Sequence, residues 1–329
     1  MSNSMPAELQ VILNSGMITA ANAHDIRAKF YTDAKIGVEE ATWLFALNGG
    51  CRKKDVFWEI LFVEALTDFL VFQVQPEGHV DETAAQWLIG MIDSAGAVKS
   101  ISEFELLINV LEKSDSSPEF LVNYALAQVK LAITSGQGPL RNSKRPVPAC
   151  AVTADDVGIL RQLMHAPASA GSINITRGEA EMLFDINDIT AASENDPAWV
   201  NFFGKAIANH MMADEAYLAP SRAEALRVEK WLENPKADVG GFFSRMVSGL
   251  RGILGINTVS GRATKAKLLK QVAAIGESEN ITEAEALWFM QRLNRDGQMS
   301  EAEYAALSFL KRESKDIHPS MLPLLQQVA

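Results

Sequence analysis

The chain has 329 residues, of which 48% are hydrophobic, and a formal net charge of −11. This length and composition allow at least one large core and favour two domains, since single domains rarely exceed about 250–300 residues. The negative charge argues against nucleic-acid binding by the chain as a whole, because contacts with phosphates need a basic surface.

Neither the N-terminus nor the cysteines indicate export. Residues 1–9 lack the basic region and apolar run of a secretory signal, and Cys51 and Cys150 are too few and too far apart for a disulfide framework or a metal knuckle. We therefore predict a cytoplasmic protein, bacterial in style, with the inner face of the membrane as an alternative peripheral location.

The first long apolar stretch, residues 56–74, approaches the length of a membrane span. Glu59, Glu64 and Asp68 lie inside it at roughly helical spacing. We therefore expect a buried helix with one solvent-facing edge.

Two segments of the chain are similar to each other in sequence, which is typical of a repeat architecture. Residues 36–48 align with residues 175–187 at an offset of 139, with identity at six of 13 positions. Further along, Trp58, Phe62 and Ala65 align with Trp199, Phe203 and Ala206 at an offset of 141. A first unit is therefore expected to occur twice.

A second unit also recurs. Residues 80–88 align with residues 281–289 at an offset of 201, which places Trp87 on Trp288, and Ser102 and Glu105 are then expected to match Ser300 and Glu303. The order is first unit, second unit, first unit again, an insertion, and second unit again. We predict an all-α fold that arose by tandem duplication of helix-loop-helix units.

The domain boundaries follow from this order. Residues 134–149 are dense in Gly, Pro and Ser and cannot continue a helix. We predict a first helical repeat domain at 15–133, a linker at 134–151, and a second repeat domain at 152–329 that contains an insertion at 236–278.

Helix starts carry a clear signal. In a capping box, a Ser or Thr side chain and a Glu three residues later satisfy free backbone N–H groups. Thr176 with Glu179, Thr282 with Glu285, and Ser300 with Glu303 fit this pattern.

Residues 292–303 resemble the calcium loop of an EF-hand, with Asn294 at the third place, Asp296 at the fifth and Glu303 at the twelfth. This resemblance implies an EF-hand-like helix-loop-helix unit and makes these three residues weak candidates for calcium ligands. Arg292, however, stands at the first place, where a calcium loop needs an oxygen donor. We therefore expect no bound metal and interpret the glutamate as part of the helix start.

The pairing of an apolar residue with Glu four positions later recurs at the other predicted helix starts. The pairs are Ile36 with Glu40, Ile101 with Glu105, Ile175 with Glu179, and Ile281 with Glu285. The units are also similar to the helical domains of bacterial tellurite-resistance-like proteins.

No catalytic or cofactor site is expected. The five histidines fall in different units without metal-binding spacing, and nucleophile elbows, phosphate loops and dinucleotide fingerprints do not occur. His210 aligns with Phe69, which favours a packing or partly solvated role. The tryptophans mostly recur at equivalent positions and are interpreted as core residues.

The insertion is the feature that the repeat does not explain. Residues 236–270 hold seven basic residues and one acidic residue, a formal sum of +6, so the remainder of the chain carries −17. An apolar stripe with flanking arginines predicts a basic amphipathic segment, extended by a basic run. The residues expected to dock are Phe242, Phe243, Arg245, Met246, Leu250, Arg251, Leu254, Arg262, Lys265, Lys267 and Lys270.

This segment can be interpreted in three ways: it docks on the protein's own acidic body, in a groove of a partner protein, or on an anionic membrane. We favour a non-enzymatic interaction or adaptor protein that binds another protein. A peripheral membrane protein and a weakly calcium-responsive EF-hand-like protein are the alternatives, and the oligomeric state stays open.

Overall fold

The computed structural model describes residues 4–31, 35–74, 77–141, 150–164, 166, 175–212, 281–293, 295, 298–314 and 317–328. Most of them lie in helices, which confirms the predicted all-α class. In this part of the chain, no helix combines the length and the apolar character that a membrane span requires.

The chain forms two compact units. The first comprises Met1–Pro148 and Ala166–Ala170, and the second comprises Ala149–His165 and Gly171–Ala329. The boundary at residue 148 falls within the predicted linker.

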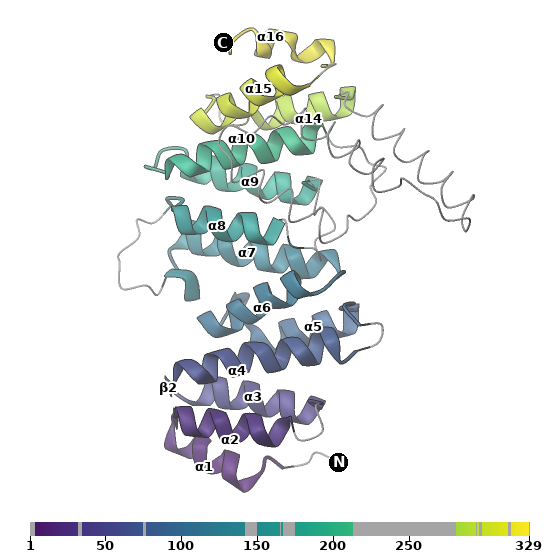
Figure 1. The fold of residues 1–329 in the computed structure, drawn as a ribbon. Coiled ribbons are helices and arrows are strands. Elements are labelled where there is room, and N and C mark those ends of the chain that lie inside the picture. The colour runs from purple at the N-terminus through teal and green to yellow at the C-terminus, as the bar shows by residue number, and fades with distance from the viewer. Residues whose placement is uncertain are drawn as a thin grey trace, which may run out of the picture. The chain divides into compact units, whose positions relative to one another are not determined.

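The helices of the first unit run from α1 to α7 (Figure 1), and a short 3₁₀ turn, η2, follows α7. Its helices are α1 (Ala7–Ser15), α2 (Ala20–Phe30), α3 (Val38–Gly50), α4 (Val56–Thr67), the π-helical turn η1 (Asp68–Phe72), α5 (Glu82–Ile92), α6 (Ile101–Lys113), α7 (Glu119–Ser135) and η2 (Pro139–Arg141). Alternate helices contact one another: α1 with α3, α2 with α4, α4 with α6, and α5 with α7. Since α7 continues through Ser135, the linker begins after the predicted residue 134.

Two short strand pairs lie between these helices. β1 (Met17–Ile18) pairs in parallel with β2 (Lys53–Lys54), and β3 (Asp93–Ser94) pairs antiparallel with β4 (Ala97–Val98). Each strand has two residues, so these pairs tie loops together and build no extended sheet.

The described part of the second unit is also helical. They are α8 (Ala154–Met164), α9 (Arg177–Thr190), α10 (Pro197–Met211), α14 (Glu283–Leu293), α15 (Glu301–Glu313), the 3₁₀ turn η3 (Pro319–Met321) and α16 (Leu322–Leu325). α10 packs against α8, α9 and α15.

The predicted helix starts in this unit are confirmed. Thr176 and Glu179 form a complete capping box at α9, and Ser300 and Glu303 form one at α15. Before α14, the Thr282 N–H donates to the Glu285 carboxylate at 2.8 Å, and the Glu285 N–H donates to the Thr282 hydroxyl at 3.3 Å.

At α6 the predicted alignment was wrong by two residues. The residue that caps α6 is Ser100, whose hydroxyl accepts from the Glu103 N–H at 3.4 Å, and Glu103 is buried. Ile101 and Glu105, expected to mark the helix start, are exposed on the first turns of α6. Ser100 and Glu103 therefore correspond to Ser300 and Glu303 at an offset of 200.

Aromatic side chains form the core of each unit. In the first unit, the Phe45 ring meets those of Phe62 and Trp87 edge to face, with centroids 5.3 and 5.7 Å apart. In the second unit, the Phe184 ring meets those of Phe203 and Trp288 edge to face at 5.1 and 5.6 Å. The five tryptophans within the described residues all pack on other rings, as predicted; Trp231 lies outside these residues.

A buried asparagine holds three elements together in each unit. Asn48 accepts from the indole N–H of Trp58 at 3.2 Å, and its amide nitrogen lies 3.4 Å from the Ser100 hydroxyl. Asn187 accepts from the indole N–H of Trp199 at 3.2 Å and donates to Ser300 at 2.9 Å. Burial makes these bonds important, because an unpaired amide in the core costs free energy.

Candidate functional site

The residues predicted to dock a partner or a membrane, from Phe242 to Lys270, lie outside the described residues, as does the whole insertion at 236–278. Two of the three weak calcium candidates, Asn294 and Asp296, also lie outside them.

The third calcium candidate, Glu303, acts at the start of α15. Its carboxylate accepts from the Ser300 N–H at 2.7 Å, and the side chain is buried. Among the described residues, no group of three or more His, Cys, Asp or Glu side chains is arranged to hold a metal ion. The geometry of Glu303 is that of a capping residue.

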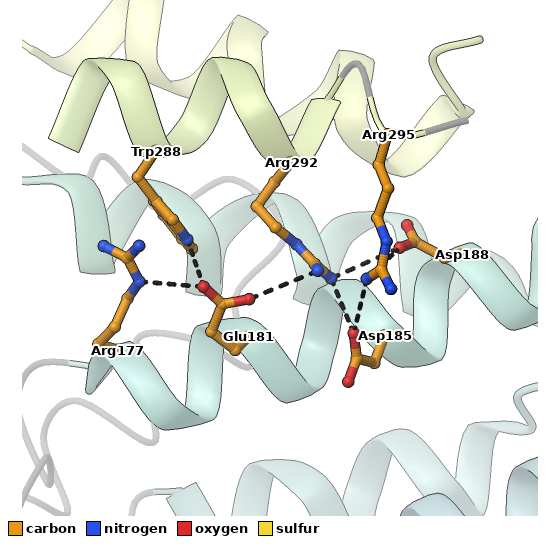
Figure 2. A network of polar contacts seen from close by, with 7 residues as sticks. All are labelled: Arg177, Glu181, Asp185, Asp188, Trp288, Arg292 and Arg295. Atoms are coloured by element: carbon orange, nitrogen blue, oxygen red, sulfur yellow. Dashed lines mark hydrogen bonds and ion pairs between the residues drawn. The ribbon is translucent and has the colours of Figure 1, made fainter. Parts of the chain in front are cut away.

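Arg292, which aligns with the first position of the calcium loop, faces the carboxylates of α9 (Figure 2). Its side chain is only 11% exposed, and its guanidinium nitrogens lie 3.5 Å from Glu181, 3.0 Å from Asp185 and 3.5 Å from Asp188. A position that gives calcium an oxygen ligand in an EF-hand is therefore held here by a cation in ion pairs.

The contacts around Arg292 continue in both directions along α9 and α14 (Figure 2). Arg295 lies 3.1 Å from Asp185, and the indole N–H of Trp288 donates to Glu181. Arg177 pairs with Glu181 at 3.1 Å and stacks over the Trp288 ring at 3.9 Å from its centroid. Because its cations and carboxylates compensate one another, this network stabilises the packing of α14 on α9.

A groove of about 610 Å³ lies on the first unit, between α4 and α6. Its wall on the α4 side continues into η1, and its opposite wall is one stripe of α6. The lining residues are Val56, Glu59, Ile60, Val63, Glu64, Thr67, Asp68, Phe72, Glu105, Asn109 and Lys113.

Large apolar side chains are exposed along this groove. Val56 is 59% exposed, Ile60 53% and Phe72 40%, and Phe57 and Ile101 add further exposed apolar surface on the same two helices. Single exposed apolar residues are common on protein surfaces, but several of them that line one concave surface indicate a binding site.

Carboxylates share the groove with these apolar residues. Glu64 forms a bidentate pair with Arg27, with both N···O distances 2.8 Å, and Asp68 accepts from the Tyr31 hydroxyl at 2.7 Å. Among the described residues, no cation lies within ion-pair distance of Glu59 or Glu105. The acidic stripe expected on residues 56–74 is therefore one wall of the groove.

Glu59 on α4 and Glu105 on α6 influence each other electrostatically. Partial removal from water in the groove raises the pKa of the Glu105 carboxyl above its ordinary value, and the negative charge of Glu59 raises this pKa further. Both effects disfavour the ionised carboxylate, so a cation placed between the two groups would stabilise their charges.

The second unit has close contact where the first has its groove. α10 and α15 align with α4 and α6, which places Gly204 on Val63 and Ala305 on Glu105. A Cβ atom at Gly204 would lie 3.0 Å from the Ala305 Cβ, so the two helices meet there backbone to backbone. Val63 and Glu105 are larger and both line the groove, and the distance between packed helices depends on the side chains at their contact.

Comparisons with family models, with curated proteins and with solved structures find no match to this chain.

The chemistry of the groove suits binding. Its apolar row can be removed from water by another apolar surface, and its unpaired carboxylates can be neutralised by cationic groups. Sequence analysis missed this site as a binding surface. The available signal was the coincidence of Glu59, Glu64 and Asp68 with an apolar run.

Proposed function

We propose that this chain is a non-enzymatic protein-interaction or adaptor protein that binds a partner helix in the groove between α4 and α6. The observation that supports this proposal is the exposed row of Val56, Ile60 and Phe72 inside a concave surface. Helix-in-groove recognition uses such a row, since an amphipathic helix buries its own apolar face against it.

We further propose that the two units descend from one duplicated EF-hand-like helix-loop-helix module. The recurrence of the Asn–Trp hydrogen bond, the edge-to-face aromatic contacts and the Ser–Glu helix caps at aligned positions supports this origin. The two copies then differ where function is proposed, because the first has a groove and the second a close helix contact.

The basic segment at residues 236–270 is proposed as a second docking surface, on the strength of its +6 charge and apolar stripe in the sequence. Its alternative role, binding of an anionic membrane, predicts attachment to anionic liposomes that weakens as salt is added. The calcium-responsive alternative is less favoured, because Arg292 is ion-paired and Glu303 caps a helix.

Affinity co-purification from the native host tests the proposed function. The intact chain is compared with Ile60→Lys, which places a charge in the groove, and with a matched control, Val11→Lys, on α1. Ile60 and Val11 are 53% and 69% exposed, so neither substitution removes core packing. A fourth chain carries a Gly/Ser linker of equal length in place of residues 236–270.

We expect a specific partner that is recovered with the intact chain and with Val11→Lys but lost with Ile60→Lys. A partner that is lost only when residues 236–270 are replaced would move the interaction from the groove to that segment. Equal recoveries from all four chains would contradict the proposed interaction function.

A further inference from the structure

We infer that the occupant of the groove is a basic amphipathic helix of a partner protein. This inference rests on the proposed function, which it makes chemically specific. An apolar stripe on the partner would cover Val56, Ile60 and Phe72, and Lys or Arg side chains at its edges would reach Glu59 and Glu105.

The charge of the groove supports a basic partner. Four carboxylates and one ammonium line it, a formal sum of −3. Arg27 already pairs with Glu64, and Tyr31 donates to Asp68, so the carboxylates still open to a partner are those of Glu59 and Glu105. They come from opposite walls and influence each other, as the raised pKa of Glu105 indicates. A cation bound between them would pair with both.

The dimensions of the groove suit a helix. α4 has 12 residues and η1 has five, so this wall is about 25 Å long at about 1.5 Å per residue. A partner helix of about 16–18 residues would cover it with four to five turns, and residues at every third or fourth position would face the apolar row.

The same charges disfavour two other occupants. An anionic membrane would be repelled by the carboxylates, since anionic lipids attract basic surfaces. A second copy of this chain, groove against groove, would bring two negative surfaces together, and like charges across an interface cost free energy.

A peptide titration against the full-length chain tests the inference. The probe is a fluorescently labelled amphipathic helix of about 18 residues with Leu on one face and Arg and Lys beside it. Two comparison peptides keep the Leu face but carry Glu, or Gln, at the basic positions. The variants are Glu105→Lys in the groove and Asp25→Lys, an exposed residue on α2 with the same charge change.

We expect the basic peptide to bind at least about tenfold more tightly than the Glu peptide. Glu105→Lys should lower the affinity for the basic peptide roughly tenfold, and Asp25→Lys should leave this affinity unchanged. Equal affinity for all three peptides would overturn the basic assignment. If no peptide binds while partner recovery still depends on Ile60, the proposed function stands and this inference fails.

The chain's own segment at residues 239–256 has similar sequence chemistry, so competition must be measured. If the chain with residues 236–270 replaced binds the probe markedly more tightly than the intact chain, the assignment to a partner is overturned in favour of this segment. Equal affinities leave the partner assignment in place.

Discussion

Gly204 on α10 lies against Ala305 on α15 so closely that a Cβ atom at residue 204 would be 3.0 Å from the Ala305 Cβ and 3.1 Å from its carbonyl carbon. The aligned residues in the first unit, Val63 and Glu105, are both larger and line the groove. α10 and α15 therefore approach each other at this position more closely than side chains as large as Val and Glu would allow.

Replacing Gly204 by Val, the residue of the first unit, should therefore destabilise the second unit by about 2–3 kcal/mol, because the backbone of α15 blocks the added methyl groups. Gly158 on α8 is the matched control, since a Cβ there would meet no atom within 4 Å. We expect Gly158→Val to change the free energy of unfolding by no more than about 0.5 kcal/mol. Urea unfolding measures the free energy of unfolding of both variants, and equal losses of stability would contradict the close contact between α10 and α15.

His210 should make the second unit less stable in mild acid. Its Nδ1 donates to the Ile175 carbonyl at 2.8 Å, and its buried Nε2 has no hydrogen-bond partner among the described residues. Burial lowers the pKa of this imidazole; the Ile175 carbonyl and Glu181 oppose the shift, and Arg177 adds to it. The unfolded chain therefore binds a proton that the folded chain excludes, and stability falls as pH drops below the ordinary value of about 6.5.

The change is His210→Phe, which copies Phe69 of the first unit. Because of this group, the free energy of unfolding of the wild type should fall by up to about 1.4 kcal/mol for each pH unit below about 6.5. The variant should lack this pH-dependent component. Parallel pH profiles of the two proteins between about pH 7.5 and about pH 5.5 would show that His210 is not held neutral in the fold.

Arg292 and Arg295 both contact Asp185 and Asp188 but differ in burial, with side chains 11% and 57% exposed. Arg292→Leu should destabilise the second unit by about 2–4 kcal/mol, because it leaves Glu181, Asp185 and Asp188 without their central cation. Arg295→Leu should cost less than about 1 kcal/mol, since an exposed ion pair is screened by water. Thermal unfolding compares the two variants, and similar losses of stability would argue against the central role of Arg292.

The sequence predicted those features that depend on local patterns. The capping boxes at Thr176 and Ser300 could be recognised because each needs only a hydroxyl and a glutamate three residues apart. The packing role of His210 followed from its alignment with Phe69, and in the structure its ring meets Trp288 edge to face at 5.0 Å between centroids.

Features that depend on contacts distant in sequence could not be predicted. Nothing local distinguishes Asn48 or Asn187 as the acceptor for a tryptophan 10 or 12 residues away. The groove is lined by side chains from α4, η1 and α6, which come together only in the fold. The cap at α6 was placed two residues late, since Ser102 and Glu105 repeat the spacing of Ser100 and Glu103.

Hydrogen–deuterium exchange of the full-length chain with and without the basic amphipathic peptide tests the central claim most directly, because it locates the binding surface. Binding in the groove predicts slower exchange in residues 56–72 and 101–113, and no such change in α10 and α15, where Gly204 and Ala305 close the equivalent surface. The same slowing should be absent from Ile60→Lys and present in Val11→Lys. Unchanged exchange in residues 56–72 and 101–113 at saturating peptide would contradict the assignment of this groove as the binding site.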